Sequence, residues 1–136
     1  MTCTYEYIDN WLKVNLSPER YEHSLGTAEC ARELAERFGE NPEKAYFTGL
    51  IHDCAKCLPK DETLHIIKTF LNLEDGELCS PKTHHAPVGA YIAKKEFKID
   101  DEEILSAIRW HTIGKVNMTP FEKIIFLADK IETRTR

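Results

Sequence analysis

A polar cap residue followed directly by proline occurs four times in this chain, and this pattern constrains the fold more than any other feature. The pairs are Ser17-Pro18, Asn41-Pro42, Ser80-Pro81 and Thr119-Pro120. A side-chain oxygen at the cap accepts hydrogen bonds from the first N–H groups of a helix, and proline suits the first helical position because it has no N–H to satisfy. No stretch alternates apolar and polar residues for long enough to indicate a strand. The chain is therefore predicted to be all-α.

About seven helices with short connections are expected, packed as one bundle. Gly39 and Gly114 lie just beyond the ends of two of them, as is typical after a helix. A chain of 136 residues is long enough for one domain with one core, so we expect a single domain over residues 1–136. The expected helices cover residues 5–14, 18–38, 42–57, 61–71, 84–97, 100–112 and 120–132.

Charge and composition narrow the classes of function. The chain has 18 basic and 23 acidic residues and a formal net charge of −5, whereas a nucleic-acid groove or a binder of anionic membranes needs a basic face. The first residues show no secretory signal, and no apolar run approaches the roughly 20 residues of a membrane span. Five cysteines are an odd number for a disulfide framework and are expected to stay reduced. We therefore expect a cytoplasmic protein that binds neither nucleic acid nor membranes.

Several ionisable residues fall on faces that are otherwise apolar. Asp129 lies four residues after Ile125 and eight after Phe121, so it shares their buried stripe. Similar reasoning places four histidines and a second aspartate inward, and the direction of the first histidine is the least certain. These residues are His23, His52, Asp53, His85 and His111.

Two interpretations of these residues remain open. Each histidine alone is more often a hydrogen-bonded core residue than a ligand, and Asp129 alone is equally consistent with a salt bridge to Arg20 or Arg109. Six such groups in one small core are costly to satisfy separately, whereas one or two divalent cations would satisfy them together. Imidazole and carboxylate ligands without cysteine favour iron, manganese, cobalt or zinc over calcium.

Five sequence blocks carry a family resemblance. The order of His23, His52-Asp53 and Asp129 resembles the H…HD…D signature of the HD-domain metal-dependent phosphohydrolase superfamily. Within that superfamily the chain is similar to the YqeK family of bacterial enzymes, which cleave diadenosine tetraphosphate symmetrically into two ADP. The blocks are residues 20–24 (RYEHS), 49–56 (GLIHDCAK), 85–90 (HAPVGA), 107–112 (AIRWHT) and 128–132 (ADKIE).

The resemblance implies an all-α HD fold that holds one or two metal ions. Iron is the expected metal, and manganese, cobalt and zinc are the alternatives. Asp53 would bridge two ions and also serve catalysis, because a metal-bound hydroxide would attack a β-phosphorus of the substrate beside it. The first metal site implied is His23, His52, Asp53 and Asp129, and the second is His85 and His111 with Asp53.

Four residues near the signature are assigned to the substrate. Lys56 shares a helical face with the HD pair and is assigned to catalysis and to the substrate phosphates as a point charge. Arg20 and Arg109 are assigned as further phosphate contacts, and Thr112 as a hydrogen-bond donor to phosphate. The alternatives are that Lys56 is a solvated surface residue and that Arg20 and Arg109 each pair with a local carboxylate.

The chain departs from the resembling family after residue 132. There the family has proline and an arginine-containing loop followed by further helix, whereas this chain ends in Thr133-Arg134-Thr135-Arg136. We therefore expect the C-terminal helical extension to be absent. Either Arg134 or Arg136 is expected to contact phosphate. A homodimer is possible from the sequence, which does not give the oligomeric state.

Other functions also stay open. Enzymes that hydrolyse guanosine tetra- or pentaphosphate place a Glu-Asp pair one turn after the HD dipeptide, where this chain has Lys56-Cys57. The Gly-Tyr-Pro motif of cyclic-dinucleotide phosphodiesterases is absent. Hydrolysis of a deoxynucleotide and a non-catalytic nucleotide-binding role remain as alternatives. His65, on a polar helix, and His84, about 100° around the helix from His85, are left out of the site.

Overall fold

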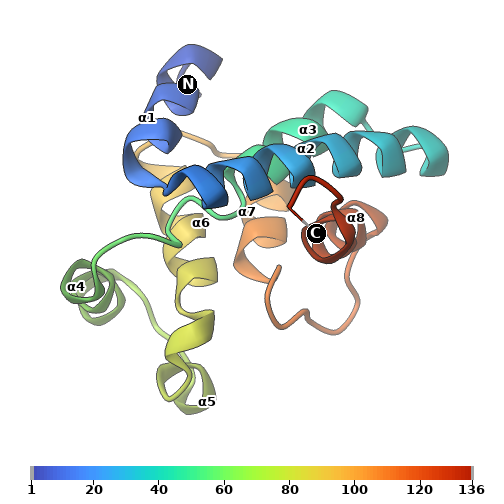
Figure 1. The fold of residues 1–136 in the computed structure, drawn as a ribbon. Helices are drawn as coiled ribbons and strands as arrows, with labels where there is room; N and C mark the ends of the chain where they lie inside the picture. Colours follow the sequence, from blue (N-terminus) through green and yellow to red (C-terminus); the bar gives the residue numbers. More distant parts are fainter. Residues whose placement is uncertain (1, 136) are drawn as a thin grey trace.

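The computed structural model describes residues 2–135, and within them it confirms the all-α expectation (Figure 1). This part of the chain contains eight α-helices and one 3₁₀ helix, and no strand. The helices are α1 (Tyr5–Asn15), α2 (Pro18–Phe38), α3 (Pro42–Ile51), α4 (Lys60–Phe70), α5 (Asp75–Leu78), the 3₁₀ helix η1 (Pro81–Thr83), α6 (His85–Lys95), α7 (Glu102–Arg109) and α8 (Pro120–Ile131).

Three of the four cap–proline pairs start an α-helix as expected. The Ser17 side chain caps α2, the Asn41 side chain caps α3, and Thr119 caps α8 through a reciprocal capping box with Glu122. Ser80 differs, because the pair that it opens starts only the short 3₁₀ helix η1, and α6 begins at His85. The Ser80-Pro81 pair therefore marks a turn that leads into α6 rather than the start of α6 itself.

The helix that follows Asn41 is shorter than predicted. It ends at Ile51 rather than near Cys57, because the backbone tightens into bonds between residues three apart, such as Lys56 N–H to Asp53 O at 2.9 Å. The helix predicted over residues 100–112 likewise ends early, at Arg109. The sequence reading missed α5, because a single helical turn of four residues offers no apolar periodicity to detect.

The packing leaves five chain segments meeting near the centre of the molecule. Helix α2 packs on α3 and α8, and α7 lies between α6 and α8. Apolar side chains mainly of α1, α3, α6 and α7 form one core cluster, to which α2 and α4 each add a residue, and side chains mainly of α2, α7 and α8 form another. Helices α4 and α5 extend to one side of this body (Figure 1). The functional residues come from the segments that meet in the middle.

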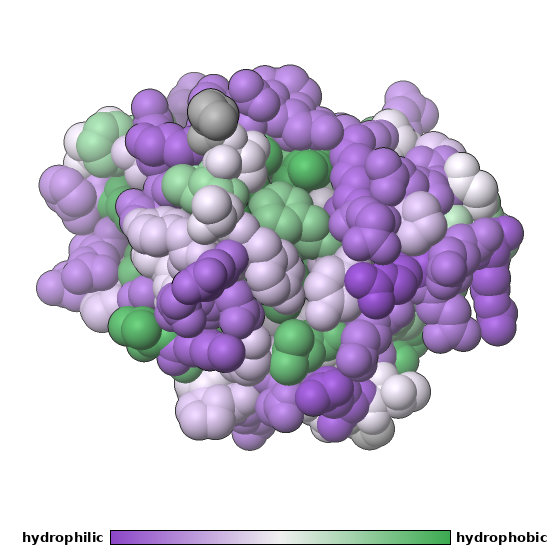
Figure 2. Space-filling model, turned by 90° about the horizontal axis from the view of Figure 1, so that it is seen from above, coloured by the Kyte–Doolittle hydropathy of each residue, from purple (hydrophilic) through white to green (hydrophobic). Residues whose placement is uncertain are grey.

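The surface view in Figure 2 is mostly hydrophilic, with apolar residues scattered between charged ones. Among the described residues no helix has both the length and the apolar character needed to cross a membrane.

Candidate metal centre

The fold brings all six predicted ligand residues together, although they span more than a hundred positions in the sequence. Four of them are almost completely buried, whereas the side chain of His85 is 12% exposed and that of Asp129 is 17% exposed. The centre is therefore closed on most sides and open at these two residues. It consists of His23 on α2, His52 and Asp53 directly after α3, His85 at the start of α6, His111 just after α7, and Asp129 near the end of α8.

One carboxylate oxygen organises the first half of the centre. Asp129 Oδ1 lies 2.8 Å from His23 Nε2 and 2.9 Å from His52 Nε2. The ligand atoms of these three residues all lie within 4.8 Å of one another, which is close enough for a single cation to contact all of them. The side chains come from three different elements, so only the tertiary packing creates this group.

The second half of the centre surrounds Asp53. Its Oδ1 atom is buried without a hydrogen-bond partner, and it faces His85 Nε2 at 3.5 Å and His111 Nε2 at 3.8 Å. The ligand atoms of His52, Asp53 and His111 again lie within 4.8 Å of one another. A buried carboxylate oxygen without a donor is costly, and a divalent cation between these groups would satisfy it. The donor set therefore fits a metal ion.

Three of the histidines are held in an orientation that suits metal binding. His52 Nδ1 donates to the Gly49 carbonyl at 2.6 Å, and His111 Nδ1 donates to the Ile108 carbonyl at 2.7 Å. With Nδ1 donating to a carbonyl in each ring, Nε2 is the atom that faces the centre, and in the neutral imidazole its lone pair would be available to a metal ion. His23 Nδ1 is held in a similar way, 2.8 Å from a carboxylate oxygen of Glu132.

At His85, His111 and Asp53 the electrostatics give the protonation states that metal ligands need. At His52 burial would lower the pKa, but the carboxylates of Asp129 and Asp53 outweigh it and raise the pKa. Burial, reinforced by neighbouring cationic groups, lowers the pKa of His85 to about 4 and that of His111 to about 3, so both are neutral at pH 7. Burial alone would raise the pKa of Asp53, but His52 and Arg20 outweigh it and lower this pKa to about 2. The carboxylate is therefore ionised and two of the imidazoles are neutral.

Glu132 is a residue of this centre that the sequence interpretation missed. Its carboxylate is 1% exposed, and besides His23 it accepts hydrogen bonds from the N–H groups of Arg134 and Thr135 at 2.7 and 3.0 Å. A side chain at Gly26 would displace it, because a Cβ there would lie 2.8 Å from Arg134 Cβ and closer still to the Glu132 carboxylate. The available signal was its spacing of three residues from Asp129, which puts both on one helix face.

The structure gives the assigned arginines different surroundings. Arg20 lies against the centre, where its Nε is 3.0 Å from Asp53 Oδ2, so it pairs with a predicted ligand. Arg109 instead pairs with Glu77 at 2.7 Å and stacks over the Trp110 ring at 3.9 Å. Neither pairing is the salt bridge to Asp129 that was considered as an alternative.

The other residues assigned to the substrate have different surroundings. Lys56 is exposed and lies in the turns after α3, not on a helical face, and it lines a cavity that His85 also lines. Thr112 is half-buried in the turn after α7. Arg134 pairs with Glu22 at 2.9 Å and with Glu29 at 3.3 Å, both on α2, and Arg136 lies outside the described residues.

Residues 20–134 match the family model described as HD domain. The chain is 45% identical over 124 residues to the symmetrical bis(5'-nucleosyl)-tetraphosphatase of Bacillus subtilis strain 168, and 42% identical over 121 residues to the protein of that name from Halalkalibacterium halodurans. Each alignment covers 89% of this chain but only 65% of the relative, so the chain spans about two-thirds of the length of these curated relatives.

A solved structure is also similar. It is the crystal structure titled "predicted HD superfamily hydrolase involved in NAD metabolism" from Clostridium acetobutylicum, which is 41% identical in sequence. The TM-score is 0.92, and the match covers 97% of this chain and 70% of the other. The helical arrangement around the centre is therefore shared with this solved structure.

Proposed function

The chain belongs to the HD domain family, and from that membership we propose that it hydrolyses diadenosine tetraphosphate symmetrically, with metal ions, into two ADP. Water adds across the central phosphoanhydride in this reaction. The water oxygen bonds to one β-phosphorus, the bridging oxygen leaves with the other ADP, and the protons of water pass to phosphate or solvent.

The observation that carries the proposal is that four histidines and two aspartates gather in one largely buried centre, which includes the unpartnered Asp53 Oδ1 atom. Buried polar atoms in an ordinary helical core are hydrogen-bonded, whereas Asp53 Oδ1 has no hydrogen-bond partner among the described residues. The symmetrical tetraphosphatases named above are 42–45% identical over most of this chain, which supports the substrate assignment.

HD membership implies that the centre holds divalent metal. We propose one or two iron ions, with manganese, cobalt and zinc as alternatives, because imidazole nitrogens and carboxylate oxygens suit all four metals. His23, His52, Asp53 and Asp129 would hold one ion, and His85 and His111 would hold a second with Asp53 between them. When bound, such ions lower the pKa of water and neutralise phosphate oxygens.

Two residues beside the centre have separate roles in this proposal. Arg20 donates to Asp53 Oδ2 and so keeps this carboxylate ionised and in place. Asp53 Oδ1 is then left facing the histidines. Lys56, exposed at the rim beside His85, is positioned to attract the phosphate chain as a point charge. We also place the enzyme in the cytoplasm, because the five cysteines are all free in the described residues and would stay reduced there.

The test is product identification with purified protein. The protein is incubated with diadenosine tetraphosphate and added iron or manganese, products are separated by chromatography, and bound metal is measured on the same sample. We expect ADP as the only nucleotide product. Products of AMP and ATP, or no turnover with any of the four metals, would contradict the proposal. Guanosine tetraphosphate and a deoxynucleotide serve as competing substrates.

Two matched variants connect the activity to the centre. His52→Ala removes a ligand and is expected to lose both metal content and turnover. His65→Ala removes an exposed histidine on α4 outside the centre and is expected to keep both. If His52→Ala hydrolysed the substrate as fast as the parent protein, the assignment of the centre would be wrong.

A further inference from the structure

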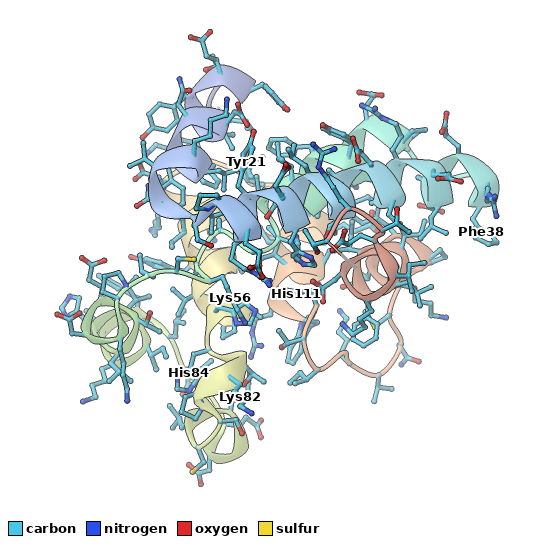
Figure 3. The ribbon with its side chains drawn as sticks, in the orientation of Figure 1. Tyr21, Phe38, Lys56, Lys82, His84 and His111 are labelled. Atoms are coloured by element: carbon cyan, nitrogen blue, oxygen red, sulfur yellow. The ribbon has the colours of Figure 1, made fainter. Side chains whose placement is uncertain are left out.

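An open cavity of about 310 Å³ lies beside the metal centre and is lined by the turns after α3, the start of α4, η1 and the start of α6. His85 belongs to both the cavity wall and the metal centre, so the two are continuous. In the view of Figure 3, Lys56 and His111 both lie toward the middle of the molecule, and His84 and Lys82 lie further toward α5. The volume falls within the range of small-molecule sites.

The charge of this cavity is opposite to that of the whole chain. Its wall contains Lys56, Lys60 and Lys82 but no carboxylate, although the chain has a net charge of −5. None of these lysines forms an ion pair within residues 2–135, so their charges are available to a ligand. Four further cavities each include at least one aspartate or glutamate. Positive potential is therefore concentrated next to the metal centre.

The backbone reinforces this potential. Lys60 is the first residue of α4 and His85 is the first residue of α6, and both lie in the cavity wall. Neither helix start has a side-chain cap within the described part of the chain, whereas the other helices of eight or more residues do. An uncapped helix start carries partial positive charge, which would add to the attraction that the lysines exert on an anion.

The rest of the wall is a mixture of apolar and polar residues. Leu58, Leu64 and Pro81 line the cavity beside the lysines and Thr63, and His84 is 6% exposed and held by a 2.9 Å hydrogen bond to the Glu77 carbonyl. An apolar wall beside concentrated positive charge suits a nucleotide, because the base and ribose need apolar contact and the phosphates need cations. A simple inorganic anion would not use the apolar side chains.

Resting on the function proposed above, we propose that this cavity binds one ADP half of the dinucleoside substrate, the half that leaves when the central anhydride breaks. Lys60 and Lys82 are then specificity-determining residues that contact the phosphates of this half, in addition to Lys56. They come from α4 and η1, outside all five sequence blocks of the family resemblance. The metal centre would cleave the bond, and this cavity would select a substrate with a second nucleotide.

The test compares a Lys60→Ala/Lys82→Ala double variant with the parent holoprotein on diadenosine tetraphosphate. Each lysine that contacts phosphate by a charge-assisted hydrogen bond contributes about tenfold in binding. We therefore expect KM to rise by about tenfold to a hundredfold, the upper figure if both lysines contribute independently, kcat to change less, and the affinity for ADP in calorimetry to fall by a similar factor. Metal content should be unchanged, because neither lysine touches the centre.

The matched control is Lys68→Ala, which removes an exposed lysine of the same helix that does not line the cavity. It is expected to keep the KM and the ADP affinity of the parent. If the double variant turned over the substrate with the KM and ADP affinity of the parent, the cavity proposal would be overturned and the proposed function would stand. If the parent produced no ADP, both proposals would be overturned.

Discussion

Gly49 allows α2 and α3 to approach closely, and replacing it with alanine would force them apart. An alanine Cβ at this position would lie 2.9 Å from Ala28 Cα and 3.1 Å from the Thr27 carbonyl carbon. Ordinary carbon–carbon contacts are about 3.5–4.0 Å, so the helices must separate by about 0.5–1 Å, because these atoms belong to the backbone and cannot rotate away. Overpacking of this kind costs about 1–3 kcal/mol.

The gain in helix propensity partly offsets this cost, since alanine is favoured over glycine by about 1 kcal/mol in a helix interior. Gly76→Ala on α5 provides the matched control, because a Cβ at Gly76 would meet no atom within 4 Å. In urea unfolding of the two variants, we expect Gly49→Ala to be less stable than Gly76→Ala by about 1–3 kcal/mol. Equal stabilities would refute the packing argument.

The same substitution tests the metal centre. His23 lies on α2 and His52 follows α3, and both contact Asp129 Oδ1 at 2.8 and 2.9 Å. Because a site must be held to within about 0.5 Å, separating the helices should weaken metal binding roughly tenfold in a chelator competition. If Gly49→Ala bound metal as tightly as the parent, His23 and His52 would not share one ion.

Three other substitutions test separate parts of the structure. Glu132→Gln replaces the carboxylate that holds His23 Nδ1, and chelator competition should show metal affinity weaker by about 10- to 100-fold; an unchanged affinity would mean that Glu132 does not position the ligand. Burial would raise the pKa of Glu122, but hydrogen bonds led by the Ser106 hydroxyl lower it. Its contribution to stability is therefore complete above the ordinary glutamate pKa and is lost as the pH falls. Thermal unfolding of the parent should show a steeper loss of stability in acid than that of Glu122→Gln, and parallel pH profiles would contradict this. Phe97→Ala opens a cavity at a fully buried position and should cost about 3–5 kcal/mol in urea unfolding, whereas a cost below about 1 kcal/mol would mean that the core collapses around it.

Much of the fold could be predicted from local rules. The caps at Ser17, Asn41 and Thr119 start helices where they were expected, because side-chain capping and proline geometry act within a few residues. Helical periodicity placed Asp129 inward for the same reason, since it depends only on the spacing to apolar neighbours. The ends of helices were less predictable, as the early end of α3 at Ile51 shows, because turns compete with the last helical bonds at little cost.

The sequence by itself determined that the chain is helical, and which ionisable side chains turn away from water. The tertiary structure alone decided which of them meet: that Arg20 pairs with Asp53, that Glu132 holds His23, and that Lys60 and Lys82 line one cavity. The physical reason is range. Capping and helical period act over one or two turns, whereas the distance between Glu132 and His23 depends on how whole helices pack, and no local pattern in the sequence encodes it.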